Sequence, residues 1–152
     1  VAGAVALGEA AELAGKELAA GAPSRLERLR DRLHDTLAAR LPGRVALNGH
    51  PVRRLPSTLN VGIAGTRGHD VLAECTTVAA STGSACHAGT HEPSPVLRAM
   101  NVSEESALAA IRLSLGRWTT DADVEHAAAA LAAAARMDGS PRVDRQPAGV
   151  PE

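Results

Sequence analysis

One cysteine in a run of small residues is the strongest candidate for chemistry in this sequence. Cys86 belongs to STGSACHAGTHEPSPVL, residues 81–97, where serine, threonine, glycine and alanine predominate around it. Because such a segment has few side chains to pack, we expect residues 81–93 to form a loop that exposes the thiol. The thiolate is the nucleophilic form of cysteine, and His87 and His91 are close enough in sequence to raise its fraction.

Two other interpretations of these residues stay open. A single cysteine is often an inert buried residue, which is what we expect of Cys75 at the end of an apolar helical pattern. Cys86, His87 and His91 also offer three possible metal ligands. A structural zinc ion needs four ligands in fixed geometry, and a glycine-containing loop is a poor cage, so we expect no metal site.

Two long helices are predicted before this loop. Residues 1–20 are rich in alanine and predict a helix without a visible N-cap. Ser24 and Glu27 have the spacing of a capping box, which predicts the start of the second helix. Leucines then recur at steps of three and four residues until Pro42-Gly43, which ends the pattern. The resulting apolar stripe consists of Leu26, Leu29, Leu33, Leu37 and Leu41.

Alternating apolar and polar residues predict strands that are buried on one face. The two clearest alternations span residues 59–63 and 111–115. Shorter strands are predicted at residues 44–47 and 77–79. Because successive side chains of a strand point to opposite faces, Arg112 is expected on the face away from the apolar residues.

Short helices are predicted among and after these strands. One spans residues 69–75, and another follows Ser94, which is suited to the N-cap and precedes a proline. Asn101 is expected to end that helix, since asparagine tolerates the left-handed conformation. Thr120 and Asp123 are expected to open the final helix.

The order of these elements predicts an α+β fold. We expect an antiparallel or mixed sheet with helices on one side, preceded by long helices. The chain divides into a helix over residues 1–20, a small domain over residues 21–138 and a disordered tail over residues 139–152. With no Phe, no Tyr and one Trp, the core must consist of aliphatic residues and alanine. Such a core buries little area, which makes a further packing partner plausible.

Charge and hydropathy exclude several classes of protein. The formal net charge is −1, and the fifteen arginines and one lysine are scattered, so no nucleic-acid partner is expected. We expect no membrane span, because no apolar run is long enough, and no basic-then-apolar pattern typical of a signal peptide opens the sequence. Two cysteines do not make a disulfide framework, so we expect free thiols and a cytoplasmic location.

Several motifs resemble the C-terminal region of cysteine desulfurases, enzymes of the class V aminotransferase superfamily that depend on pyridoxal 5'-phosphate (PLP). These are STGSAC, the following EPSPVLRAM, and IRLSLGRWTTDADV at residues 111–124, together with LPSTLNVGI at residues 55–63. The similarity extends from about residue 1 to about residue 135. It implies the small C-terminal domain of a fold-type I PLP enzyme.

The resemblance also implies a reaction and residue roles. Cysteine desulfurases move sulfur from L-cysteine to a protein cysteine as a persulfide, release L-alanine and supply iron–sulfur cluster or thio-cofactor synthesis. Cys86 resembles the nucleophile that becomes the persulfide. Arg112 resembles the arginine that binds the substrate carboxylate, a task suited to a planar donor fork. A sulfur-acceptor protein, such as an iron–sulfur scaffold, and a homodimer are the implied partners.

The sequence departs from this family pattern at two places. Nothing in it matches the PLP-binding lysine, since Lys16 is its only lysine and lies in the first helix. We therefore expect residues 1–20 to belong with an absent PLP-binding domain, and this chain alone to be inactive. His87 replaces a hydroxyl residue common in the family and, with GHDVLAEC at residues 68–75, resembles selenocysteine lyases. A selenocysteine lyase, a stand-alone persulfide carrier and an inactive remnant are the alternatives.

Overall fold

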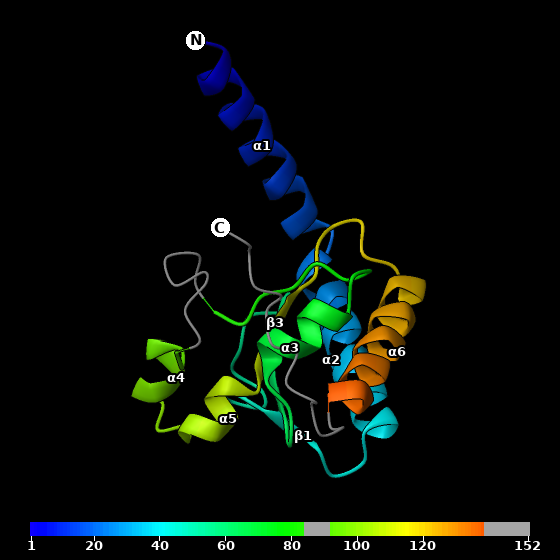
Figure 1. Cartoon of the computed structure of the whole chain (residues 1–152). Helices are drawn as coiled ribbons and strands as arrows, with labels where there is room; N and C mark the ends of the chain where they lie inside the picture. Colours follow the sequence, from blue (N-terminus) through cyan, green and yellow to red (C-terminus); the bar gives the residue numbers. More distant parts are fainter. Residues whose placement is uncertain (84–91, 139–152) are drawn as a thin grey trace, which may run out of the picture.

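The computed structural model describes residues 1–83 and 92–138 of the chain. Figure 1 shows the helices and strands along the sequence. These are α1 (Ala2–Ala19), α2 (Ala22–Arg40), β1 (Val45–Leu47), β2 (Thr58–Ile63), α3 (Gly68–Glu74), α4 (Pro95–Ala99), α5 (Glu104–Leu108), β3 (Ala110–Ser114) and α6 (Asp121–Asp138).

The three strands form one antiparallel sheet in the order β1-β2-β3. β2 is the central strand, and its register runs from Thr58 opposite Ser114 to Gly62 opposite Ala110. β1 pairs with the end of β2 and places Val45 opposite Ile63. This sheet confirms the predicted α+β fold class with an antiparallel sheet, but helices pack on both of its faces and not on one side as predicted.

The main hydrophobic core lies between one face of the sheet and helices α2, α3 and α6. α2 and α6 lie side by side along that face (Figure 1). The predicted leucine stripe of α2 is confirmed, since Leu37 is fully buried and its neighbours in the stripe face the same core. The strands contribute Leu59, Val61, Ile63, Ile111 and Leu113, and α6 contributes Val124, Ala128 and Leu131.

A second, smaller cluster lies on the other face of the sheet. It contains Leu97 of α4, Ala107 of α5 and Ala110 of β3, with Val102 packed against them. The sequence patterns did not predict α5, because a helix of five residues is too short to show an apolar period. The signal that could have found it is Ser103, whose side chain accepts a hydrogen bond from the Ser106 backbone N–H.

α1 extends away from the rest of the molecule (Figure 1). None of its residues is buried, and only Leu13 and Glu17 are even half-buried. Apolar side chains such as Leu7 and Leu18 are exposed. Across residues 1–83 and 92–138, no helix combines the length and the apolar character that a membrane span requires.

The capping box predicted at Ser24 and Glu27 is wrong. α2 begins earlier, at Ala22, after an N-cap residue Gly21 whose φ of 80° is left-handed. The short Ala20-Gly21 link between α1 and α2 explains this start, because glycine alone takes that turn at little steric cost. Pro23 is accepted in the first turn of α2, where its missing N–H has no intrahelical partner to lose.

The strand predicted at residues 77–79 is also wrong. Those residues form turns and irregular backbone, and the segment meets the outer edge of β3 at Ser81. A hydrogen bond joins the Thr77 hydroxyl to Nε2 of His126 at 3.1 Å, so a contact with α6 replaces strand pairing there.

Other predicted helix ends are confirmed in part. The Thr120 backbone N–H donates to the Asp123 carboxylate at 2.8 Å, and the Asp123 N–H donates to the Thr120 hydroxyl at 3.2 Å. The Thr120 hydroxyl also donates to the Asp123 carboxylate at 2.7 Å, and this bond, together with the one from the Thr120 backbone N–H, holds the pKa of Asp123 below its usual range. Asn101 has a left-handed φ of 59°, as expected of the residue that ends α4. Ser94 occupies the N-cap of α4, but its side chain makes no capping bond.

Truncating the centre of the leucine stripe tests the importance of the main core. Leu37→Ala is expected to lower the free energy of unfolding by about 2–5 kcal/mol, because it removes packed methyl groups and leaves a cavity. Urea denaturation followed by far-UV circular dichroism measures the change. Leu18→Ala on exposed α1 is the matched control and should change stability by less than about 0.5 kcal/mol. Equal effects of the two variants would contradict the assigned core.

Candidate functional site

Arg112 lies in the middle of β3, with its backbone held on both sides. It stands opposite Asn60 of β2, and across the other edge its N–H donates to the Ser81 carbonyl at 2.6 Å. The Ser81 N–H donates back to the Arg112 carbonyl at 3.2 Å. Both main-chain groups of Arg112 are therefore bonded to Ser81, while β2 pairs with β3 along the other edge.

The side chain of Arg112 is exposed, whereas its neighbours Ile111 and Leu113 are buried. This confirms the predicted strand phase. With respect to residues 1–83 and 92–138, the guanidinium makes no hydrogen bond or ion pair. Its donors are therefore available for a ligand, and a planar fork of N–H donors matches the geometry of a carboxylate.

Ser81 is the first residue of the loop predicted to carry the nucleophile. Its hydroxyl donates to the Gly83 carbonyl at 2.7 Å and accepts from the Gly83 N–H at 3.2 Å, which makes a tight local turn. Sequence reasoning treated Ser81 only as a small loop residue. A single isolated pairing with a distant strand leaves no periodic signal in the sequence.

Cys86, His87 and His91 lie outside the described residues, as do the proposed tail residues 139–152. The structure describes the chain up to Gly83, and the bridge at Ser81 joins the start of the loop predicted to carry Cys86 to the strand of Arg112.

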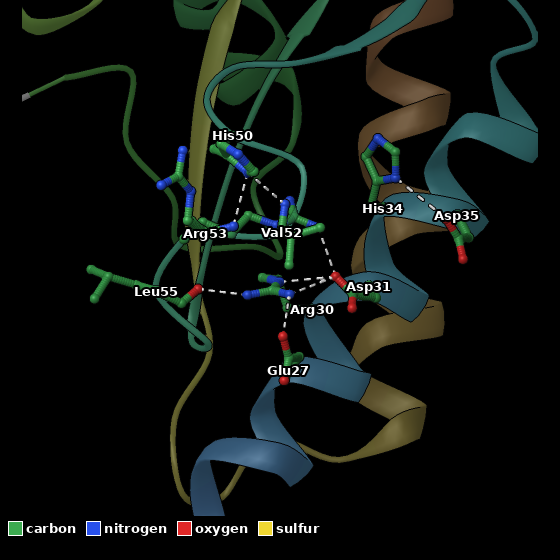
Figure 2. A network of polar contacts seen from close by, with 10 residues as sticks. Glu27, Arg30, Asp31, His34, Asp35, His50, Val52, Arg53 and Leu55 are labelled. Atoms are coloured by element: carbon green, nitrogen blue, oxygen red, sulfur yellow. Dashed lines mark hydrogen bonds and ion pairs between the residues drawn. The ribbon is translucent and has the colours of Figure 1, made fainter.

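A buried arginine network fixes the segment that leads into β2, the strand beside β3. Arg30 of α2 is 1% exposed and donates to the Leu55 carbonyl at 2.8 Å. It also bonds the carboxylates of Asp31 at 2.9 Å and Glu27 at 3.3 Å, and Arg54 reaches the same Asp31 oxygen at 2.7 Å. Figure 2 shows the Arg30 guanidinium between these groups.

The same segment is shaped by His50. Its Nδ1 accepts hydrogen bonds from the backbone N–H groups of Val52 at 3.0 Å and Arg53 at 2.9 Å (Figure 2). Both bonds require a ring nitrogen without a proton, so Nδ1 is the acceptor of the ring. These contacts close a local turn at residues 50–53, whereas the bonds from Arg30 to the Leu55 carbonyl and from Arg54 to Asp31 hold the segment against α2. The segment leads into β2, which pairs with the strand that carries Arg112.

Cys75 is buried in the main core, as predicted from the apolar pattern that it ends. Burial raises the pKa of the Cys75 thiol, although hydrogen bonds from the backbone of Val78 and Thr77 oppose the shift. A buried thiol with a raised pKa is a poor nucleophile. The structure therefore excludes Cys75 from the candidate site.

Alkylation tests this contrast. Iodoacetamide should modify Cys75 in the native chain on the order of 10²-fold more slowly than in urea, because the thiol reacts only after local opening. Peptide mass spectrometry over time resolves Cys75 from Cys86. Fast labelling of Cys75 under native conditions would show that its surroundings open readily.

The described residues do not fit a PLP-binding site. Lys16 is the only lysine of the sequence, and it is exposed on α1, paired with Glu12 at 2.6 Å. A lysine that forms a Schiff base needs an enclosed site that positions the cofactor, which this solvent-exposed helix face lacks. Within residues 1–83 and 92–138, no three His, Cys, Asp or Glu side chains come together in a way that could hold a metal ion.

Comparisons with known proteins identify the family. The model of the class-V aminotransferase family matches residues 1–126. A cysteine desulfurase IscS of Acinetobacter baumannii is 42% identical over 122 residues, which cover 80% of this chain and 29% of that protein. A cysteine desulfurase IscS of Anaeromyxobacter is 45% identical over 126 residues, 83% of this chain and 31% of that protein.

Solved structures give the same result. A NifS-like protein matches 83% of this chain and 30% of its own, with a TM-score of 0.65 and 26% identity. A NifS-like protein of Rickettsia africae matches 74% of this chain and 28% of its own, with a TM-score of 0.59 and 26% identity.

This chain belongs to the class-V aminotransferase family. Within that family, the resemblance to cysteine desulfurases predicted from the motifs is confirmed by relatives that bear this name. The chain spans about three tenths of the length of the curated relatives it matches.

Proposed function

We propose that this chain supplies the part of a PLP-dependent cysteine desulfurase that holds the nucleophile and the substrate-binding arginine. The observation that carries the proposal is the bridge between Ser81 and Arg112. It joins the start of the loop predicted to carry Cys86 to the strand that presents the Arg112 guanidinium, which has no partner among the described residues. A nucleophile and a carboxylate-binding group on one local framework are what sulfur abstraction from an amino acid needs.

Each of the two residues has a separate task in this proposal. Arg112 binds the carboxylate of L-cysteine through two parallel N–H donors and so orients the substrate. The Cys86 thiolate attacks the substrate sulfur. A sulfur–sulfur bond forms as the carbon–sulfur bond of the substrate breaks, and the carbon takes up a proton to give L-alanine. Cys86 is left as a persulfide, ready for transfer to an acceptor thiol.

PLP, when bound, withdraws electrons from the substrate so that the carbon–sulfur bond can break. The described residues do not supply its binding lysine, so we assign the cofactor to other parts of the enzyme. This chain contributes binding, orientation and the nucleophile. On the same grounds we propose a sulfur-acceptor protein, such as an iron–sulfur scaffold, as partner, a homodimer as the assembled form and the cytoplasm as location.

Selenocysteine is the alternative substrate. His87 after the nucleophile and the GHDVLAEC segment, which contains α3, support it through their resemblance to selenocysteine lyases. The same Arg112 would bind either amino acid, because both carry the same carboxylate. A comparison of selenocysteine and cysteine turnover by one preparation distinguishes the two substrates.

A chimeric enzyme tests the proposal. This chain would replace the matching 122 residues of the Acinetobacter baumannii IscS, and visible absorbance of bound PLP would report folding. The chimera is expected to release sulfide and alanine from L-cysteine in the presence of a reductant. The 152-residue chain alone, with added PLP, is expected to release none. A folded, PLP-loaded chimera without turnover would refute the proposed function.

A persulfide donor tests the stand-alone carrier. The chain alone would be incubated with a donor persulfide and its mass measured. A gain of one sulfur atom on Cys86, with no sulfide release from L-cysteine in either protein, would favour the carrier over the desulfurase.

A further inference from the structure

Arg25 of α2 holds the turn that follows β3. Its guanidinium donates to the Thr119 carbonyl at 2.8 Å, the Arg117 carbonyl at 2.8 Å and the Gly116 carbonyl at 3.3 Å. The turn is also closed internally, since the Gly116 N–H donates to the Thr119 hydroxyl at 2.8 Å. One side chain from a distant helix thus fixes three backbone groups of residues 116–119.

Among the described residues, this turn carries the ion pair that joins α1 to the rest of the molecule. The Arg117 guanidinium lies 2.7 Å from the Glu17 carboxylate, near the end of α1. Glu17 is one of only two half-buried residues of that helix. The other attachment is the short link at Gly21, whose left-handed φ of 80° sets the chain direction.

Trp118 gives the turn its own spectroscopic probe. The Arg117 guanidinium lies 5.2 Å from the centre of the Trp118 ring, within the range of a cation–π contact. Trp118 is the only tryptophan, and the sequence contains no tyrosine or phenylalanine. Its signals therefore report this turn alone.

We propose that Arg117 is a positioning residue that sets the orientation of α1 relative to the sheet, and that Arg25 holds it in place. Arg25 fixes the turn, the turn presents Arg117, and Arg117 pairs with Glu17. These contacts thereby fix the orientation of α1 relative to the end of β3, the strand that carries Arg112. This inference goes beyond sulfur chemistry, and its test needs no enzymatic activity.

The Glu17–Arg117 ion pair and the hydrogen bonds from Arg25 differ in physical character. The Glu17–Arg117 pair is partly exposed, with 35% and 41% of its side chains accessible, so salt screens it. The bonds from Arg25 end on neutral carbonyls and are less sensitive to salt. High salt should therefore release α1 while leaving the turn ordered. Loss of Arg25 should release both.

Nitrogen-15 relaxation of the 152-residue chain measures both links, through the backbone amides of α1 and the indole N–H of Trp118. Glu17→Gln is expected to increase the detached population of α1 about two- to fivefold, as fits an exposed ion pair. Trp118 should stay ordered. Wild-type protein in about 1 M NaCl, where the Debye length is about 3 Å, should behave in the same way.

Three further variants make the test specific. Arg25→Lys keeps the charge but cannot reach three carbonyls, so both α1 and Trp118 should gain mobility. Exchanging the charges, Glu17→Arg with Arg117→Glu, should restore the order of α1. Glu12→Gln, which breaks the pair with Lys16 inside α1, is the matched control and should change neither signal. Unchanged α1 order in Glu17→Gln, an ordered Trp118 in Arg25→Lys, or no rescue by the exchanged charges would overturn the proposal.

Discussion

Cys86→Ser should lower sulfide release from L-cysteine by about 10³-fold or more in the chimeric enzyme proposed above. A serine hydroxyl is a far weaker nucleophile toward sulfur, and it cannot form a persulfide. PLP absorbance and L-cysteine binding should persist, because the cofactor and the carboxylate are held by other groups. The measurement is the initial rate of sulfide formation, with mass spectrometry of the protein after one turnover.

Cys75→Ala is the matched control for this variant. This substitution removes the other thiol of the sequence, which lies in the main core with 4% of its surface exposed. The Cys75→Ala enzyme should retain turnover. Wild-type rates in Cys86→Ser with loss in Cys75→Ala would reverse the assignment of the two cysteines. Loss in both would point to folding, which the PLP absorbance of each variant checks.

Arg112→Gln should lower kcat/KM for L-cysteine by about 10²-fold or more in the same enzyme. The expected loss follows from two charge-assisted hydrogen bonds to the substrate carboxylate, each contributing roughly 1.5–3 kcal/mol. Steady-state kinetics over a range of L-cysteine concentrations measures it. Arg112→Lys should recover only part of the loss, since a single ammonium keeps the charge but not the fork.

Arg28→Gln provides the matched control for Arg112. Arg28 is exposed on α2 and, like Arg112, its side chain has no hydrogen bond or ion pair with the residues that the structure describes. Its loss should leave kcat/KM within about twofold, as expected for a surface substitution. An Arg112→Gln enzyme with wild-type kcat/KM would show that another group binds the carboxylate.

Local patterns were sufficient to predict much of the fold. The spacing of the leucines around Leu37 indicated which face of α2 is buried, because packing on a helix repeats every three or four residues. Alternation in β3 placed Arg112 on the exposed face, because successive side chains of a strand point to opposite faces of the sheet. The apolar pattern ending at Cys75 correctly predicted that this cysteine is buried.

Contacts between distant parts of the chain could not be predicted in this way. The pairing of Ser81 with Arg112, and the bonds from Arg25 to residues 116–119, depend on how separate elements pack. Arg30 illustrates the point most clearly, since a charged residue on a polar-looking stretch of α2 is 1% exposed. Its burial depends on the carbonyl of Leu55 and on neighbouring carboxylates, which composition and periodicity do not reveal.

The described segments before and after residues 84–91 are anchored to the sheet unequally. On the N-terminal side, Ser81 is hydrogen-bonded to β3, which belongs to the main core. On the C-terminal side, α4 and α5 are held by a cluster of Leu97, Ala107 and Ala110 with Val102. So few apolar contacts make α4 and α5 a separate unit of low local stability. This unit is therefore expected to open locally more readily than the sheet.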